Sequence, residues 1–112
     1  MRGLVLVVAL LVAGTAAAEV DPTSANYVML GCRQAIIPGN FQNPMLQDIC
    51  FGRVAGVWDM AQTAGWVCGP NSTILEQALR IVVQYVDARP ARMHERFTTL
   101  ALEALRAAWP CK

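Results

Sequence analysis

The sequence TILEQALRIVVQYVDARP, residues 73–90, decides the fold class of this 112-residue chain. Its apolar positions recur every three or four residues, which is typical of one face of an amphipathic helix. These positions are Leu75, Leu79, Val82, Val83 and Val86. Thr73 followed by Glu76 matches a capping box that starts a helix, and Pro90 ends the pattern. The stretch therefore predicts a helix that buries one face.

Two further helices are predicted before this stretch. The first begins after Thr23 or Ser24, either of which can cap it, and stops at residues 37–39, Ile-Pro-Gly. The second begins at Asn43-Pro44, where the asparagine serves as the cap and the proline occupies the first turn. Its apolar residues recur at helical spacing until Gly65 and the turn residues that follow end it.

A fourth helix is predicted after the quoted stretch. Pro90 is suited to open it, His94 is expected in its first turn, and Pro110 stops it. No segment of the sequence shows a convincing β-strand alternation. The connections are short, so successive helices are expected to lie antiparallel. The sequence therefore predicts an all-α fold, a small disulfide-bonded bundle of about four helices in residues 19–112.

Residues 1–18 have the features of a secretory signal peptide. They combine one basic residue, Arg2, with an apolar run and with small residues at Ala16 and Ala18 before the expected cleavage site. The run is shorter than the roughly 20 residues of a membrane span. Without Arg2, the rest of the chain has eight basic and eight acidic residues and no electrostatic footprint for nucleic acid or an anionic membrane. We expect a periplasmic protein that binds neither of them.

The mature part of the chain contains four cysteines, an even number that indicates two disulfides in an exported protein. A zinc site is disfavoured, because no pair has C-x-x-C spacing and His94 is the only histidine. Cys32 and Cys50 lie at matching depth in the first two helices if these run antiparallel. Cys68 precedes the third helix and Cys111 follows the fourth, so the same packing brings them together. The layout predicts the pairs Cys32–Cys50 and Cys68–Cys111.

Residues that could carry out catalysis are scarce. Hydrolytic or transfer chemistry needs a nucleophile beside a base or paired carboxylates, yet the eight acidic residues are spread singly. No free cysteine remains if both disulfides form. His94 is expected to make a structural hydrogen bond to a neighbouring helix. We expect no catalytic residue, no metal and no cofactor, and the sequence favours a binding protein over an enzyme.

Partner-binding residues are predicted in the connection between the second and third helices, residues 65–72. It combines Trp66 with glycines, a proline and the polar side chains of Asn71 and Ser72. Loops held by a rigid scaffold commonly bind partners, and a disulfide at Cys68 lowers the entropy lost on docking. The alternative is that Trp66 fills the end of the core and that Asn71 only precedes a helix cap.

Two further features are assigned to packing. Trp58 and Trp109 are expected to lie against the core. Gly52 and Gly56 lie one helical turn apart, so we expect two helix backbones to approach closely there.

An ordered series of cysteines, glycines and prolines extends over the mature chain. It consists of Ile49-Cys50-x-Gly52, Gly56, Asp59, Val67-Cys68-x-Pro70, Tyr85 to Pro90, Ala104-Leu105 and Trp109-Pro110-Cys111. In this order and spacing the chain resembles the Rap/Tai family of bacterial immunity proteins. Where that family often has an aromatic residue after the glycine of the Cys50 motif, this chain has Arg53. The helix face around Arg53 is the second candidate binding surface, if the connection at residues 65–72 does not contact the partner.

The resemblance implies a small periplasmic protein, often a homodimer, that binds an amidase effector of type VI secretion and obstructs its active-site cleft. Two alternatives come from other classes. A periplasmic acid-stress chaperone needs a large charge change on acidification, and the sparse charged residues argue against it. A carrier of an apolar ligand would need an internal cavity of several hundred Å³.

Overall fold

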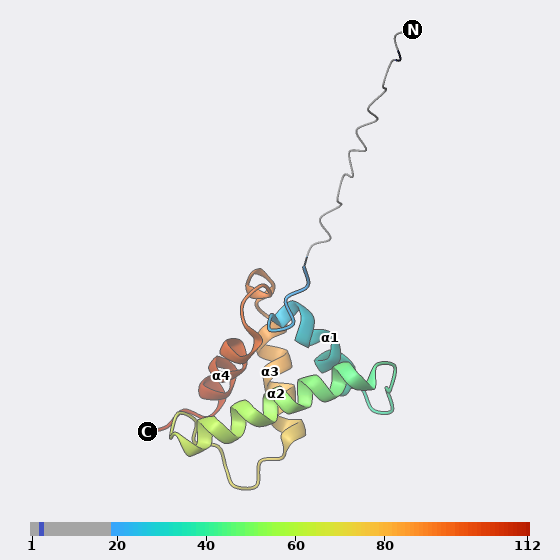
Figure 1. The fold of residues 1–112 in the computed structure, drawn as a ribbon. Helices are drawn as coiled ribbons and strands as arrows, with labels where there is room; N and C mark the ends of the chain where they lie inside the picture. Colours follow the sequence, from blue (N-terminus) through green and yellow to red (C-terminus); the bar gives the residue numbers. More distant parts are fainter. Residues whose placement is uncertain (1–2, 4–18) are drawn as a thin grey trace.

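The computed structural model describes residue 3 and residues 19–112, so the expected signal peptide lies, apart from residue 3, outside the described residues. Within residues 19–112, four α-helices form the bundle: α1 (Ala25–Ala35), α2 (Pro44–Thr63), α3 (Leu75–Asp87) and α4 (Phe97–Ala108). A short 3-10 helix, η1 (Pro90–Arg92), lies between α3 and α4. Residues 19–112 contain no β-sheet, and the predicted all-α fold is confirmed (Figure 1).

One apolar core joins the four helices. α1 packs chiefly against α2, and α3 packs chiefly against α4, while α2 crosses in contact with both α3 and α4 (Figure 1). Every helix contributes large side chains that are fully buried, among them Met29, Val54, Leu79, Phe97 and Leu100. Burying such a side chain contributes about 1.5–3 kcal/mol, so this core drives folding. No helix in the described part of the chain has the length and apolar character needed to cross a membrane.

Polar caps start the first two helices, as predicted. The Oγ atom of Ser24 accepts a hydrogen bond of 3.4 Å from the backbone N–H of Tyr27 in α1. The side chain of Asn43 accepts a hydrogen bond of 3.1 Å from the N–H of Leu46 in the first turn of α2. Just beyond α2, Gly65 has a φ of 73°, a left-handed conformation that glycine adopts without strain.

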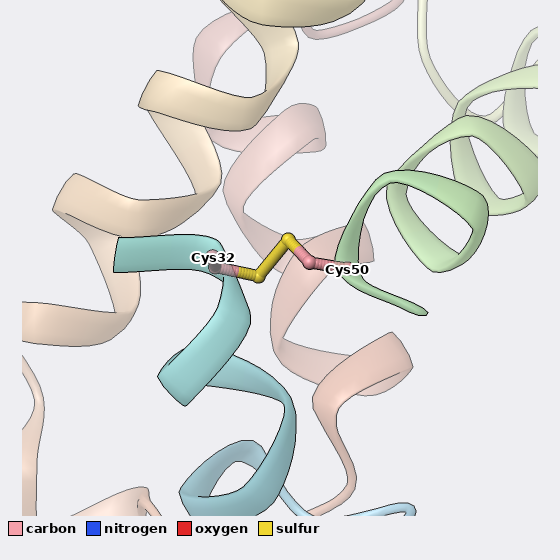
Figure 2. Close-up of a disulfide and its surroundings, with 2 residues drawn as sticks. All are labelled: Cys32 and Cys50. Atoms are coloured by element: carbon pink, nitrogen blue, oxygen red, sulfur yellow. A yellow bond between two sulfur atoms is a disulfide. The ribbon is translucent and has the colours of Figure 1, made fainter. Parts of the chain in front are cut away.

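A disulfide between Cys32 and Cys50 holds α1 against α2 (Figure 2). The two Cα atoms are 5.2 Å apart, and both cysteines are buried in the core. Gly31, next to Cys32 in the sequence, lies where the backbones of the two helices are close together. A Cβ atom at Gly31 would overlap the backbone of Leu46, so a residue without a side chain is required there. The disulfide joins the pair that the sequence predicts.

The predicted capping box at the start of α3 is wrong. α3 begins at Leu75 with Ile74 in the cap position, and no side chain caps its backbone. The N–H of Thr73 donates 3.0 Å to the carbonyl of Pro70, so Thr73 closes a turn and lies outside the cap position. Its Oγ1 atom is buried without a hydrogen-bond partner among the described residues. The apolar stripe is confirmed at four of its five positions, Leu79, Val82, Val83 and Val86.

The predicted start of the fourth helix is also wrong. The expected opening proline begins only η1, and α4 begins at Phe97. The segment between them pairs with the start of α1 instead. The carbonyl of Glu95 accepts 2.9 Å from the N–H of Ala25, and that of Met93 accepts 2.8 Å from the N–H of Asn26. The first N–H groups of a helix lack partners within it, so this tertiary pairing competes successfully with an earlier start of α4.

Candidate functional site

A groove lies between the outer faces of α2 and α4. Its volume is about 450 Å³ and its lining is mainly apolar. Each of the two helices contributes one wall. The residues that form these walls include Gly52, Gly56 and Met60 of α2 and Thr98, Thr99 and Leu102 of α4.

The α2 wall of this groove exposes the helix backbone at two glycines. A Cβ atom at Gly52 or at Gly56 would meet nothing within 4 Å among the described residues. The predicted close approach of two helix backbones at these positions is therefore wrong. Gly31 has that role, since its missing side chain leaves room for Leu46. The glycines of α2 instead leave a hollow that is open to solvent.

Two of the four predicted binding residues, Arg53 and Trp66, line the groove. Trp66 remains 49% exposed, so it does not simply fill the end of the core. Arg53 forms no ion pair within the part of the chain that the structure describes. Hydrogen bonds from Thr23 hold the pKa of Asp21 below its ordinary value, and the charges of Arg96 and Arg53 lower it further. Arg53 is partly exposed, and it is close enough to Asp21 to affect that carboxyl group without forming an ion pair with it in residues 19–112.

Asn71 and Ser72, the other two predicted binding residues, are exposed in the connection between α2 and α3 but do not line the groove. This connection is tied to the end of the chain. The N–H of Cys68 donates 3.0 Å to the carbonyl of Trp109, and Cys68 is bonded to Cys111 with 5.0 Å between the Cα atoms. The second disulfide thus also joins the predicted pair, and it fixes one side of the connection.

The ends of α2 and α4 support the same connection from the core side. Trp58 and Trp109 pack edge to face, with ring centroids 5.1 Å apart and an interplanar angle of 73°. Both rings are partly buried against the core, as predicted. A Cβ atom at Gly69 would overlap the ring of Trp58, so the backbone lies directly on that ring. The candidate loop is therefore held in place at several points.

An ion-pair cluster centred on Arg92 lies next to α4. Arg92 donates to Glu103 at 2.7 and 2.9 Å and also to Glu95, while the hydroxyl of Tyr85 donates to Glu103 at 3.0 Å. The hydrogen bonds from Arg92 hold the pKa of both carboxyl groups below their ordinary range, and the carboxylates raise the pKa of Arg92. Both acids stay ionised, so the cluster fits a structural role rather than acid catalysis.

His94 lies in the segment between η1 and α4, where its side chain is exposed. It makes no side-chain hydrogen bond within residues 19–112, so the predicted structural hydrogen bond to a neighbouring helix is wrong. His94 instead lines a second hollow of about 360 Å³ with Asp21, Tyr27 and Leu30. No group of three or more histidine, cysteine, aspartate or glutamate residues in the described chain is placed to hold a metal ion.

The α4 side of the groove was missed by sequence reasoning. Thr98 and Leu102 are four residues apart and so share one helix face, but such spacing occurs on every face of a helix. The signal that was present is on α2, where two glycines interrupt a helix at positions four residues apart. Glycine destabilises a helix interior, so two glycines on one face of a helix indicate a role other than stabilising that helix.

Comparison with known proteins gave one finding. A family model described as "Rap1a immunity proteins" matches residues 24–111, which include all four helices and both disulfides. No match was found to a curated protein or to a solved structure.

Proposed function

Because the chain belongs to the Rap1a immunity protein family, we propose that it binds and inhibits a cell-wall-degrading amidase effector of type VI secretion. Family membership confirms the resemblance to the Rap/Tai immunity proteins seen in the sequence. It supports an immunity role with a protein partner. The amidase, the periplasm as the site of action and a homodimeric state are our proposals. We also propose that the chain acts by binding alone, without catalysis and without a cofactor.

The observation that carries the proposal beyond the family is the surface around Trp66. This exposed aromatic residue belongs both to the groove and to the anchored connection that contains Asn71 and Ser72. Tryptophan and arginine are enriched at the energetic centres of protein interfaces. We propose that Trp66, Arg53, Asn71 and Ser72 form the surface that contacts the effector.

Inhibition of purified amidases tests the function. Candidate amidases from the same genome are incubated with peptidoglycan, with and without the mature protein, and the release of cut peptides is followed. We expect one of them to be inhibited at submicromolar concentration. If none is inhibited or bound below about micromolar affinity, the proposed inhibition of an amidase effector is refuted.

The export proposal has its own measurement. We expect the protein recovered from the periplasm to have the mass of a chain that begins at Glu19. A chain that retains residues 1–18, or one that stays in the cytoplasm, would contradict both the cleavage site and the place of action.

Two assays separate this function from the alternative classes. A periplasmic chaperone suppresses client aggregation near pH 3, whereas an immunity protein does not. A carrier of an apolar ligand retains a lipid-like molecule that mass spectrometry detects after organic extraction. We expect neither activity from this protein.

A further inference from the structure

The two glycines of α2 are not required by the fold of the described chain. Each lies inside a 20-residue helix, where glycine is less favourable than alanine, and neither would bring a Cβ atom within 4 Å of a neighbour. Alanine would therefore fit at both positions and stabilise the helix. The glycines leave a hollow that something outside the chain can enter.

The walls of the hollow have the composition of a protein interface. Trp66 and Met60 are 49% and 61% exposed, although both are large and apolar. Tryptophan, methionine and arginine are the residues enriched at interface centres. The backbone of α2 is bare at Gly56, so an apolar group can reach the helix itself. A volume of about 450 Å³ accommodates one large side chain together with part of its backbone.

The charge of Arg53 indicates which kind of group must lie beside that apolar group in a partner. Arg53 is the charged residue in the lining, and within residues 19–112 it has no ion-pair partner. The hydroxyl groups of Thr98 and Thr99 on the opposite wall can donate or accept hydrogen bonds. A partner that leaves Arg53 without a counter-charge on docking would lose affinity, because a desolvated unpaired charge is costly.

We propose that this groove anchors the effector by receiving one large apolar side chain of the amidase, while a carboxylate beside that side chain pairs with Arg53. The inference rests on the proposed immunity function and names the chemistry of the contact. An apolar anchor in a pocket with a charged rim is the arrangement that concentrates binding energy in few residues.

The first arm of the test uses anilinonaphthalene sulfonate, a fluorescent probe that joins an aromatic body to an anionic group. We expect the native mature protein to bind it. Gly56→Leu fills the hollow from the helix backbone and should weaken binding by about tenfold, and Arg53→Gln should weaken it by about threefold. Gln84→Leu adds the same apolar group on the exposed side of α3 and should leave binding unchanged. Near-ultraviolet circular dichroism verifies that each variant is folded.

The second arm uses the amidase that the wild-type protein inhibits. We expect Gly56→Leu to raise the inhibitory concentration by at least about tenfold, Gln84→Leu to leave it unchanged, and the amidase to displace the probe. Equal inhibition by Gly56→Leu, or a probe that stays bound in the complex, overturns the anchor while the proposed function stands. A change in sedimentation with unchanged inhibition assigns the groove to a second copy and overturns it too. If wild type inhibits no amidase, the proposed function itself fails.

Discussion

At the scale of single residues, the glycines show that one residue type can serve opposite purposes in one small protein. Gly31 is needed inside the fold, because α1 and α2 meet where its side chain would be. Gly52 and Gly56 face an open groove and have no such neighbour. All three lie in helices, so their spacing and local sequence do not distinguish them.

Substituting alanine separates the two kinds of glycine. We expect Gly52→Ala and Gly56→Ala each to stabilise the protein by about 0.5–1 kcal/mol and to raise its melting temperature by roughly 2–8 °C. Gly31→Ala should destabilise it by about 1–3 kcal/mol, because the added methyl group overlaps the Leu46 backbone. Urea unfolding of the three variants measures these differences. A loss of stability in Gly56→Ala would show that its space is already occupied in the folded chain.

The carboxylates around Arg92 predict how stability depends on pH. The pKa values of Glu95 and Glu103 lie below their ordinary 4.5 in the folded protein, chiefly because Arg92 donates hydrogen bonds to both. The unfolded chain therefore binds protons more readily than the folded one. The stabilisation is fully present above pH 4.5 and is lost as the pH falls from there through the lowered pKa values.

Urea midpoints measured between about pH 7 and pH 3 check this dependence. We expect the midpoint to fall below pH 4.5 in the wild type and to fall less steeply in Glu103→Gln. Glu76→Gln, at an exposed position on α3, is the matched control and should follow the wild type. Parallel curves for all three proteins would contradict the role given to Arg92.

At the scale of helices, the sequence correctly predicted those helix ends that depend only on residues close by in the sequence. Ser24 and Asn43 cap α1 and α2 because their side chains reach N–H groups three residues ahead. The same reasoning failed at Thr73, which closes a local turn with Pro70, and at Pro90, where the segment that follows pairs with the distant start of α1. The cysteine pairing was predicted correctly because it follows from the order and direction of the helices, which place the two cysteines of each pair at the same level of the bundle. The sequence predicted Arg53 and Trp66 as binding residues but not the groove that they line, since its other wall comes from α4.

The two disulfides differ in their access to solvent, and they should therefore differ in reactivity. Cys32 and Cys50 are buried, whereas Cys68 and Cys111 are exposed. Thiol–disulfide exchange requires the attacking thiolate to reach a sulfur atom, so mild reductant should open Cys68–Cys111 first. Alkylation followed by mass spectrometry should find label on these two cysteines while the other pair stays intact. Simultaneous labelling of all four would mean that exchange requires global unfolding.

At the scale of the whole molecule, a thin core is reinforced by covalent bonds. A domain of this size buries a modest share of its surface, and the buried side chains must offset the entropy of about ninety ordered residues. Each of the four helices contacts the three others, and one disulfide fastens α2 to α1. The second fastens the end of the chain to the segment that follows α2. The bundle is thus held together by the packing of its helices and by two disulfides.

Reducing both disulfides tests how much stability the apolar core provides without them. Loss of a native bridge costs about 2–5 kcal/mol in small exported domains, which is comparable with their entire stability. We expect strong reductant to lower the melting temperature steeply or to unfold the mature protein at 37 °C, as followed by far-ultraviolet circular dichroism. An unchanged melting curve would show that the bridges contribute nothing to stability.

The pairing between the start of α1 and the segment before α4 has a consequence for how the chain matures. Residues 23–26 obtain their native backbone partners from residues 93–97, almost at the other end of the chain. A polypeptide leaves a ribosome or a secretion channel with its N-terminus first. The residues of α1 therefore emerge long before residues 93–97, with which they pair. The native start of α1 therefore gains these hydrogen bonds only after residues 93–97 have been made. Nearly the whole chain must be synthesised before the N-terminal helix can form all its native hydrogen bonds. Contacts between residues so far apart in the sequence slow folding.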